Sequence, residues 1–453
     1  MCQSKCDSGD SVVVGLSCGK PLREPPLLHK DMRRRYRSYL LAILAVIIAF
    51  ENGERWAVGV LLQSIKVDWH LSDTQLGLLT GIAYSFFYAV LGIPIARRAD
   101  GGNRATVITL TTALWSVATA LCGVVGSFLQ LLLMRVAVAV GEAGCGPTAP
   151  SLIADYYDRA ERPRAMSRYL LGVLLGPAIG FFLAGWLNEY YGWRRTFVCL
   201  GLPGVAVAVL AGFTLREPRC AVREAAQTPL AASASPSMRK VGVTLWANQT
   251  FRHLLFFFSI NSFFNSGIVQ WIPPYLLRSF GLHTGQVGTW LAIIFGVGGI
   301  VGTYLGGELA SRFATHNEQL QLRAMGVWGA CYGLLSVCVY LSHNYYVAFA
   351  LLAVGAIGSA AAYGPLLAAI QTLVPPHLRA QSMAILSLFS NLVGMGLGPL
   401  AAGMLSDSLR PLAGDESLRY ALIALSPGYC WSSWHLWRAC RSVNQDIEAA
   451  QRV

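Results

Sequence analysis

Long apolar segments separated by short polar ones dominate the chain. Leu76–Ile95, Val107–Val125, Trp290–Leu305 and Val347–Ile370 contain no Asp, Glu, Lys or Arg. A helix rises about 1.5 Å per residue, so roughly 20 apolar residues cross the hydrocarbon core of a bilayer. The segments lack the strict alternation of lipid-facing and lumen-facing residues that a membrane barrel requires. The pattern therefore predicts an all-α polytopic membrane protein.

About twelve such spans fit the whole chain. We expect them at residues 39–62, 76–96, 105–125, 129–150, 168–187, 195–213, 253–277, 286–309, 322–342, 345–372, 380–405 and 419–439. The last is interrupted by Ser426–Gly428 and is rich in tryptophan, which suits a membrane interface.

The spans fall into two halves that resemble each other in sequence. Gln75–Gly77 is echoed by Gln286–Gly288, and Gly176–Pro177 by Gly398–Pro399, in the same order. Pseudo-symmetric halves of this kind place a substrate site near the bilayer midplane and let one half rock against the other. That organisation is typical of a secondary transporter.

A segment rich in Arg, Glu, Ala, Ser and Pro separates the halves, as expected of a linker. The predicted organisation is a cytoplasmic N-terminal tail (1–38), a six-helix half (39–214), a cytoplasmic linker (215–250), a second six-helix half (251–440) and a cytoplasmic tail (441–453).

Charge sets the expected orientation. Hydrophobic residues make up 54% of the chain and charged residues 13%, against roughly 25% charged in a soluble domain. The net charge of +12 comes from basic residues in alternate loops and not from one compact face, so membrane topology explains it and nucleic-acid binding does not. The positive-inside rule then places both termini on the cytoplasmic side of the cell membrane.

Other chemistries leave little trace. The 11 cysteines form no C-x-x-C pair and have no histidine partners at metal spacing. Gly15–Lys20 lacks the spacing of a phosphate-binding loop, and Pro21 stands where a hydroxyl would hold magnesium. We expect no metal, no cofactor and no enzymatic activity. Outside transporters, a non-transporting membrane receptor or an intramembrane enzyme is the alternative, but neither a large soluble domain nor an in-span nucleophile with histidine is evident.

The segment Ala96–Arg104, after the second span, resembles the loop signature of the major facilitator superfamily, Gly-x-x-x-Asp-Arg-x-Gly-Arg-Arg. Asp100 and Arg104 match that signature, whereas Ala96, Gly101 and Asn103 depart from it. The resemblance implies a loop that changes partners during the conformational cycle; the alternative is a cluster of charges that only sets topology.

Three further segments together resemble the Spinster-like branch of that superfamily, which is related to sphingolipid and lysophospholipid transporters. They are Glu54–Arg55 in the first span, Ser72–Gly81 opening the second, and Arg135–Glu142 in the fourth. The family usually has Asp at the position of Glu54. The resemblance implies proton-coupled transport of a lipid-like solute.

The residues themselves support a charged cavity. Glu51, Glu54 and Arg55 lie on one helical face, and Arg135 and Glu142, seven apart, share a face of another helix. Three carboxylates oppose two guanidiniums that keep their protons, so full ionisation leaves one uncompensated negative charge in a low dielectric. We expect Glu142 or Glu54 to bind the coupling proton, with Arg55, Arg135 and Glu51 as substrate or ion-pair groups. The alternative is that these are structural ion pairs.

The second half has no matching charge within its spans. Asn261, Asn265, Gln270 and Tyr363 are its candidate cavity residues. One charged wall and one amide and aromatic wall suit a substrate with an anionic or zwitterionic head and an apolar body. A carrier of small organic acids, sugar acids or drugs is the alternative, and in either case we expect a monomer in the lipid bilayer.

Overall fold

The computed structural model describes residues 30–218, 245–313, 317–374 and 378–451. Within these residues the chain contains helices and no strand, which confirms the predicted all-α fold. The predicted N-terminal tail up to residue 29 and most of the predicted linker lie outside the described residues.

In the described part of the first half, the helices are labelled α1 to α6, and these labels do not correspond one to one to the expected spans. They are α1 (Lys30–Trp69), α2 (Asp73–Thr80), α3 (Ile82–Gly101), α4 (Arg104–Cys122), α5 (Phe128–Tyr156) and α6 (Arg162–Thr214). The second half contains α9 (Gln249–Val269), α10 (Ile272–Phe280), α11 (Thr284–Phe313), α12 (Glu318–Leu341), α13 (Tyr345–Leu373), α14 (Arg379–Phe389), η2 (Ser390–Met395), α15 (Gly396–Ala413), η3 (Gly414–Glu416), α16 (Ser417–Leu425) and α17 (Gly428–Gln451).

Several of the expected spans are divided differently in the structure. The label α6 covers both the fifth and the sixth, which are two helices separated by a non-helical turn at Gly192, where φ is +77° and glycine is strongly favoured. The second is divided at Gly81 into α2 and α3, and the eleventh contains the π-helical turn η2. In the described residues, eight helical segments are long and apolar enough to cross a membrane, and two of them, 162–214 and 381–448, contain more than one expected span.

Small residues fix the position of α1, which carries three of the candidate site residues. A Cβ added to Gly180 of α6 would lie 2.0 Å from the carbonyl oxygen of Gly53, and one added to Gly176 would lie 2.6 Å from that of Ala49. Only glycine permits this approach of α6 to α1. Gly176 and Gly180 are therefore the residues of α6 that let α1 pack closely against it.

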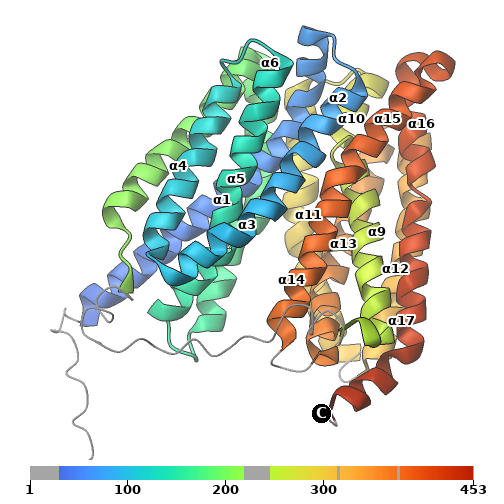
Figure 1. The fold of residues 1–453 in the computed structure, drawn as a ribbon. Helices are drawn as coiled ribbons and strands as arrows, with labels where there is room; N and C mark the ends of the chain where they lie inside the picture. The colour runs from blue at the N-terminus through green and yellow to red at the C-terminus, as the bar shows by residue number, and fades with distance from the viewer. Residues whose placement is uncertain (1–29, 219–244, 314–316, 375–377, 452–453) are drawn as a thin grey trace, which may run out of the picture.

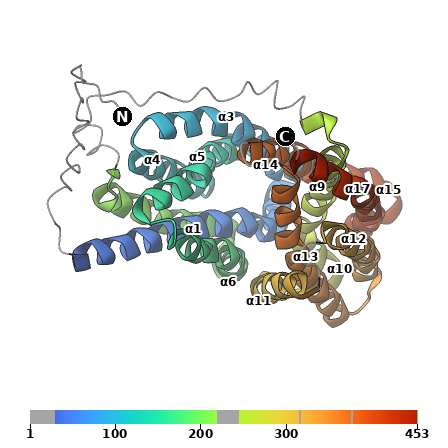
Figure 2. The same cartoon turned by 90° about the horizontal axis from the view of Figure 1, so that it is seen from below.

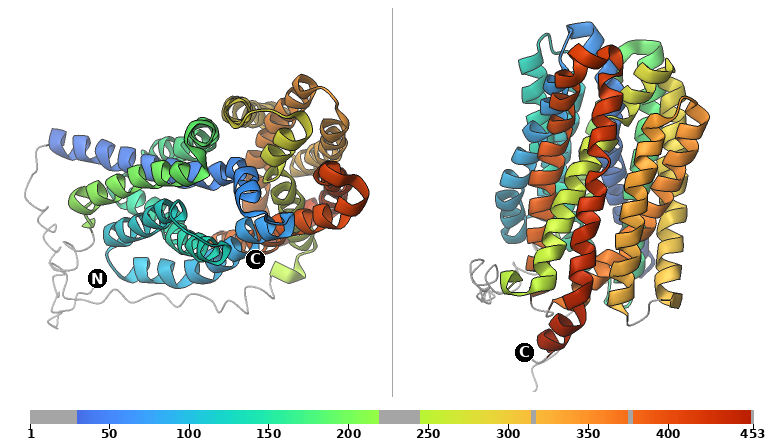
Figure 3. Two further views of the ribbon diagram at one scale, coloured as in Figure 1. Left: turned by 90° about the horizontal axis from the view of Figure 1, so that it is seen from above. Right: turned by 90° about the vertical axis from the view of Figure 1, so that its right-hand side faces the viewer.

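The two halves stand side by side and meet most closely at one end, the upper end in Figure 1. Views along the molecule show the first half and the second half as separate groups of helices (Figure 2; Figure 3, left), and the right-hand view of Figure 3 shows α17 running along the outer side of the second half.

Backbone contacts join the halves in two symmetric pairs. A Cβ on Gly77 of α2 would lie 2.5 Å from the carbonyl oxygen of Pro399 in α15, and a Cβ on Gly288 of α11 would lie 2.4 Å from that of Phe181 in α6. Gly77 and Gly288 occupy equivalent places in the internal repeat, and each packs against the helix of the opposite half that carries the repeated Gly-Pro pair.

Candidate functional site

The charged residues predicted for the site come together between α1 and α5. Arg55 donates from Nε to Oε2 of Glu142 at 3.1 Å, and from Nη2 to the same oxygen and to Oε1 of Glu51. Arg135 forms an ion pair with Glu54. The helical spacing within α1 and within α5 therefore brings all five residues into two adjoining clusters, one around Arg55 and one around Arg135.

The two clusters differ in how far they are open. The Arg55 side chain is 24% exposed, whereas those of Glu51, Glu54, Glu142 and Arg135 are at most 3% exposed. Arg55 is therefore the most exposed charged group of the two clusters.

Each of the three carboxylates keeps one buried oxygen without a hydrogen-bond partner among the described residues. These atoms are Oε2 of Glu51, Oε2 of Glu54 and Oε1 of Glu142. A buried charged oxygen without a donor is costly, and a proton on it removes most of that cost. With two guanidiniums for three carboxylates, the arrangement has room for a bound proton.

Two tyrosines of α3 complete the Arg55 cluster, and sequence reasoning missed them. The Tyr84 hydroxyl donates to Oε2 of Glu142, the oxygen that Arg55 also binds. The guanidinium carbon of Arg55 lies 5.4 Å and 5.5 Å from the ring centroids of Tyr84 and Tyr88, within cation–π range. Their spacing of four residues placed them on one helical face, but nothing in the sequence showed that this face meets α5.

The charged clusters border a cavity of about 290 Å³ between the halves. Arg55, Arg135 and Tyr84 line it from the first half, and Asn265 and Gln270 from the second. The cavity is thus charged on one side and neutral on the other.

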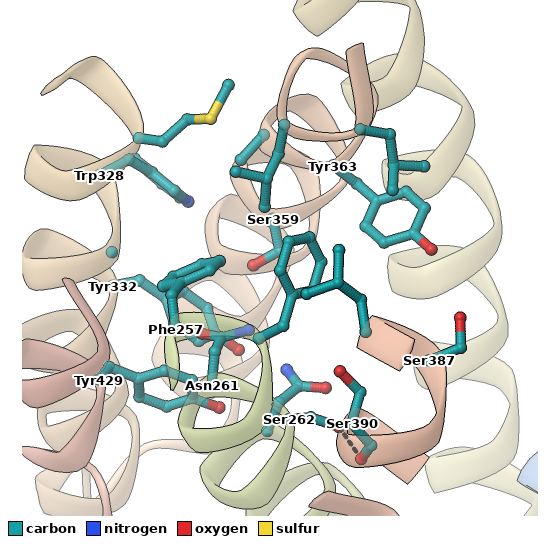
Figure 4. Close-up of a pocket in the computed structure, with 18 of the residues that line it drawn as sticks. Phe257, Asn261, Ser262, Trp328, Tyr332, Ser359, Tyr363, Ser387, Ser390 and Tyr429 are labelled. Atoms are coloured by element: carbon teal, nitrogen blue, oxygen red, sulfur yellow. Dashed lines mark hydrogen bonds between the residues drawn. The ribbon is translucent and has the colours of Figure 1, made fainter. Parts of the chain in front are cut away.

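A second cavity of about 410 Å³ lies within the second half (Figure 4). The predicted residues Asn261, Asn265 and Tyr363 line it, together with aromatic side chains such as Phe257. Asn265 and Ser262 line both cavities, so the two adjoin. We call the first the charged cavity and the second the aromatic cavity.

Arg104 of the predicted loop motif is fully buried. It donates to Glu217 from Nε at 3.0 Å, to Asp155 from Nη2 at 2.7 Å and to the carbonyl oxygen of Ser151 at 2.9 Å. Glu217 lies where the sequence indicated a linker, which hid its role. Asp100 belongs to the last turn of α3, but its side chain lies outside the described part of the structure.

Polar contacts close the end at which the halves meet, and sequence reasoning did not predict them. Arg278 of α10 donates to both carboxylate oxygens of Asp73 at 2.8 Å, and Ser406 of α15 donates to the same residue at 2.7 Å. Lys66 pairs with Asp73 from within the first half. Asp407 accepts from the backbone N–H groups of Asp73 and Thr74 at 3.0 Å and 2.7 Å, at the N-terminus of α2. We call this set of contacts the Asp73 gate.

Among the described residues, no group of three or more His, Cys, Asp and Glu side chains is placed to hold a metal ion. The polar groups that line the charged cavity are guanidiniums, hydroxyls and amides, with the carboxylates paired to the two arginines.

Comparison with known proteins assigns the family. The sequence profile of the Major Facilitator Superfamily matches residues 44–399. An MFS-type efflux pump of Mycolicibacterium smegmatis is 30% identical over 402 residues, and the match covers 88% of this chain and 91% of that relative. Protein spinster homolog 1 of Xenopus tropicalis is 26% identical, and the match covers 85% of this chain and 78% of that relative. A crystal structure of a bacterial homolog of the human lysosomal transporter Spinster, inward-facing and unoccupied, superposes with a TM-score of 0.80 at 29% identity, covering 91% of this chain and 98% of that one. The chain belongs to the major facilitator superfamily and is a Spinster-like membrane transporter.

Proposed function

We propose that the chain is a proton-coupled secondary transporter of an anionic amphipathic solute, such as a lysolipid or a sphingoid-type lipid, with Glu142 and Glu54 as the proton-binding groups. One observation carries the proposal. Arg55, partly exposed, lies at the wall of the charged cavity and is bound by two buried carboxylates, each of which keeps one oxygen without a hydrogen-bond partner in the described part of the chain.

Coupling follows from competition for Arg55. The guanidinium cannot lose its proton, so it always requires an anionic partner. When Glu142 is ionised it holds Arg55. When Glu142 takes a proton that attraction is lost, Arg55 keeps only the longer contact with Glu51 at 3.3 Å, and the guanidinium becomes available to an anionic headgroup in the cavity. Proton binding and substrate binding are then linked through Arg55, so that each changes the affinity for the other.

The Glu54–Arg135 ion pair allows a similar change of partner deeper in the protein. Glu54 and Arg135 are both nearly fully buried, and Arg135 also lines the charged cavity. A proton on Glu54 would release Arg135 toward the same headgroup. Two arginines facing one cavity suit a phosphate or sulfonate head better than a singly charged contact does.

The proposed orientation places the Asp73 gate on the outer side of the membrane. The loops expected to be cytoplasmic by their basic residues lie toward the other ends of these helices. With both termini on the cytoplasmic side of the cell membrane, the closed gate corresponds to an inward-facing state, in which cytoplasmic solute reaches Arg55. We propose that a monomer carries out this cycle.

The test uses purified protein in liposomes with an imposed pH gradient. A panel of lysophospholipids, sphingoid phosphates and small carboxylates is offered, and uptake is measured with and without the gradient. For wild type we expect gradient-dependent uptake of an anionic amphipath, and for Glu142→Gln uptake that no longer responds to the gradient.

The matched control is Glu308→Gln, which removes an exposed carboxylate paired with Arg312 one turn away in α11. This variant should behave as wild type. If Glu142→Gln retains its response to the gradient, Glu142 is a structural ion-pair residue and the coupling proposal is wrong for it.

A carrier of small organic acids, sugar acids or drugs is the second candidate. It is favoured by the size of the charged cavity, because about 290 Å³ is at the lower end of small-molecule pockets. Gradient-driven uptake of small carboxylates without uptake of any amphipath would decide for it.

A further inference from the structure

The outer surface of the second half carries an apolar groove that the proposed function does not yet use. It lies between α11, α12 and α13, has a volume of about 660 Å³, and is lined by residues that include Leu309, Phe313, Leu320, Ala324, Val354 and Ala361. We call it the α11–α13 groove. Apart from Gln321 and the indole N–H of Trp328, its lining side chains are apolar.

An apolar outer face is expected of any membrane helix, so the composition of the groove does not by itself indicate a binding site. The position of the groove beside the aromatic cavity does indicate one. Trp328, Met325 and Ala362 line both this groove and the aromatic cavity. The partition between a lipid-facing groove and a polar interior cavity is therefore a single layer of side chains.

Trp328 is the largest member of this partition. A Cβ added to Gly358 of α13 would lie 1.8 Å from Cζ2 of Trp328, so the indole lies directly against the α13 backbone. Its Nε1–H is buried and has no hydrogen-bond partner among the described residues. Figure 4 shows the Trp328 indole at the edge of the aromatic cavity, with its nitrogen directed inward. A buried donor without an acceptor costs about 1–3 kcal/mol, which a polar group of a ligand would recover.

The groove completes a series of three spaces. The charged cavity contains Arg55 and Arg135, it adjoins the aromatic cavity at Ser262 and Asn265, and the aromatic cavity adjoins the groove at Trp328. Polarity decreases in one direction from guanidinium groups through amides and aromatic rings to hydrocarbon. This gradient matches a molecule with an anionic head and a single long hydrocarbon chain.

We propose that the α11–α13 groove binds the hydrocarbon chain of the transported amphipath, with Trp328 as the barrier past which the chain enters while the headgroup occupies the aromatic and charged cavities. The occupant is the substrate's own chain and not a bilayer phospholipid, because the groove adjoins, at Trp328, the cavity that takes the headgroup. This inference rests on the proposed function and names the substrate class more narrowly, as single-chain anionic lipids.

The chain-binding role is tested by filling the groove. Ala324→Trp places an indole in the groove from an exposed position of α12, and Ala350→Trp, at an exposed position of α13 outside the groove lining, is the matched control. Each buried methylene contributes about 0.8 kcal/mol, so excluding two methylenes weakens binding about 15-fold. We expect that loss of apparent affinity for a lysophospholipid in Ala324→Trp and wild-type affinity in Ala350→Trp.

A second measurement locates the chain directly. A lysophospholipid carrying a diazirine at the end of its chain is irradiated with the protein in liposomes, and labelled peptides are identified by mass spectrometry. We expect labelling of the α12 and α13 segments that line the groove, reduced by excess unlabelled lysophospholipid and unaffected by glycerol phosphate.

The outcomes separate this inference from the proposed function. If wild type transports the amphipath with pH-gradient dependence but Ala324→Trp is unaffected and the probe labels elsewhere, the groove does not bind the chain and the function stands. Equal labelling by a diacyl phospholipid probe, unaffected by lysophospholipid, identifies a bilayer lipid as the occupant and overturns the proposal. Absence of uptake of any amphipath by wild type overturns the function itself.

Discussion

Replacing Asp73 by asparagine should open the end of the molecule at which the two halves meet. Asp73 in the first half accepts three side-chain hydrogen bonds from the second half, two from Arg278 at 2.8 Å and one from Ser406 at 2.7 Å. Its bond with Lys66 stays within the first half, so it persists whether the gate is closed or open. The inter-half contacts are the ones that the substitution weakens.

The magnitude follows from counting these bonds. An asparagine keeps one acceptor oxygen, so it loses at least one of the two bonds to Arg278, and the remaining one no longer joins opposite charges. A hydrogen bond to a charged group contributes about 1.5–3 kcal/mol net. Water hydrates the separated groups in the open state, so we expect the loss of one such bond as the net effect. That corresponds to a shift of roughly 10- to 150-fold toward the state that is open at this end.

Distances between spin labels measure this shift without reference to the orientation in the membrane. Val67 of α1 and Leu412 of α15 are exposed, lie near the gate and belong to opposite halves. In a chain with its native cysteines replaced, labels at these two positions should give a single short distance in wild type and an added longer population in Asp73→Asn. Pulsed electron–electron double resonance on protein in liposomes measures the distances and the size of both populations.

The matched control is Glu416→Gln, which removes a carboxylate paired with Arg419 in the same region but within the second half. It should leave the distance distribution unchanged. An unchanged distribution in Asp73→Asn would mean that backbone packing alone, such as that of Gly77 against Pro399, holds the gate closed. Longer distances in both variants would indicate general loosening of this end.

Two further predictions concern stability and are measured by thermal unfolding of the purified protein. Gly180→Ala should destabilise the first half by about 1–3 kcal/mol, because its Cβ would overlap the α1 backbone, whereas Gly307→Ala, where a Cβ meets nothing within 4 Å, should have no such effect. Arg135→Met should cost about 3–5 kcal/mol by leaving Glu54 buried without its charged partner, and the double variant with Glu54→Leu should recover most of that loss; an unstable double variant would show that the pair contributes more than mutual neutralisation.

Much of the helical framework could be predicted because apolar length and charge are local properties of the sequence. The break between α16 and α17 was also predicted, because Ser426–Gly428 marks it in the sequence. The break between α2 and α3 and the π-helical turn were not. The division between α2 and α3 falls at Gly81, where a Cβ would lie 2.5 Å from the carbonyl oxygen of Gly396 in the other half. The neighbour that requires glycine at this break lies more than 300 residues away in sequence. The π-helical turn η2 lies directly before Gly396, the residue of the second half that contacts Gly81.

The candidate site, too, was predictable within each helix but not between helices. Helical spacing placed Glu51, Glu54 and Arg55 on one face, and the structure brings that face against Arg135 and Glu142. Spacing cannot say which helix meets that face, and so it did not indicate that Tyr84 and Tyr88 of α3 would contribute. Pairing across long sequence separations, such as that of Asp73 with Arg278, was also not accessible, because each residue alone resembles a charge at a helix end.

The internal repeat indicates where the chemistry of the transporter lies. In both halves a glutamine accepts a hydrogen bond from a backbone N–H three residues earlier, Gln75 from Ser72 and Gln286 from His283, and the glycine two residues after each glutamine packs against the opposite half. The repeated elements therefore build the scaffold that lets the halves meet and separate. Since both copies perform this task, we expect the residues that recognise the substrate to lie where the two copies differ.

The sharpest difference is at the middle of the first helix of each half. Glu54 and Arg55 occupy it in α1, whereas the repeat places Asn265 and Ser266 there in α9, and both pairs contribute to the wall of the charged cavity or to the ion pairs behind it. If the linked binding of a proton and a headgroup is confined to the first half, the neutral wall has only to position the rest of the solute. Moving the charge pair to the second half should then abolish coupling even though a carboxylate and a guanidinium still face the same cavity, because Glu142 and Tyr84 would remain behind in the first half.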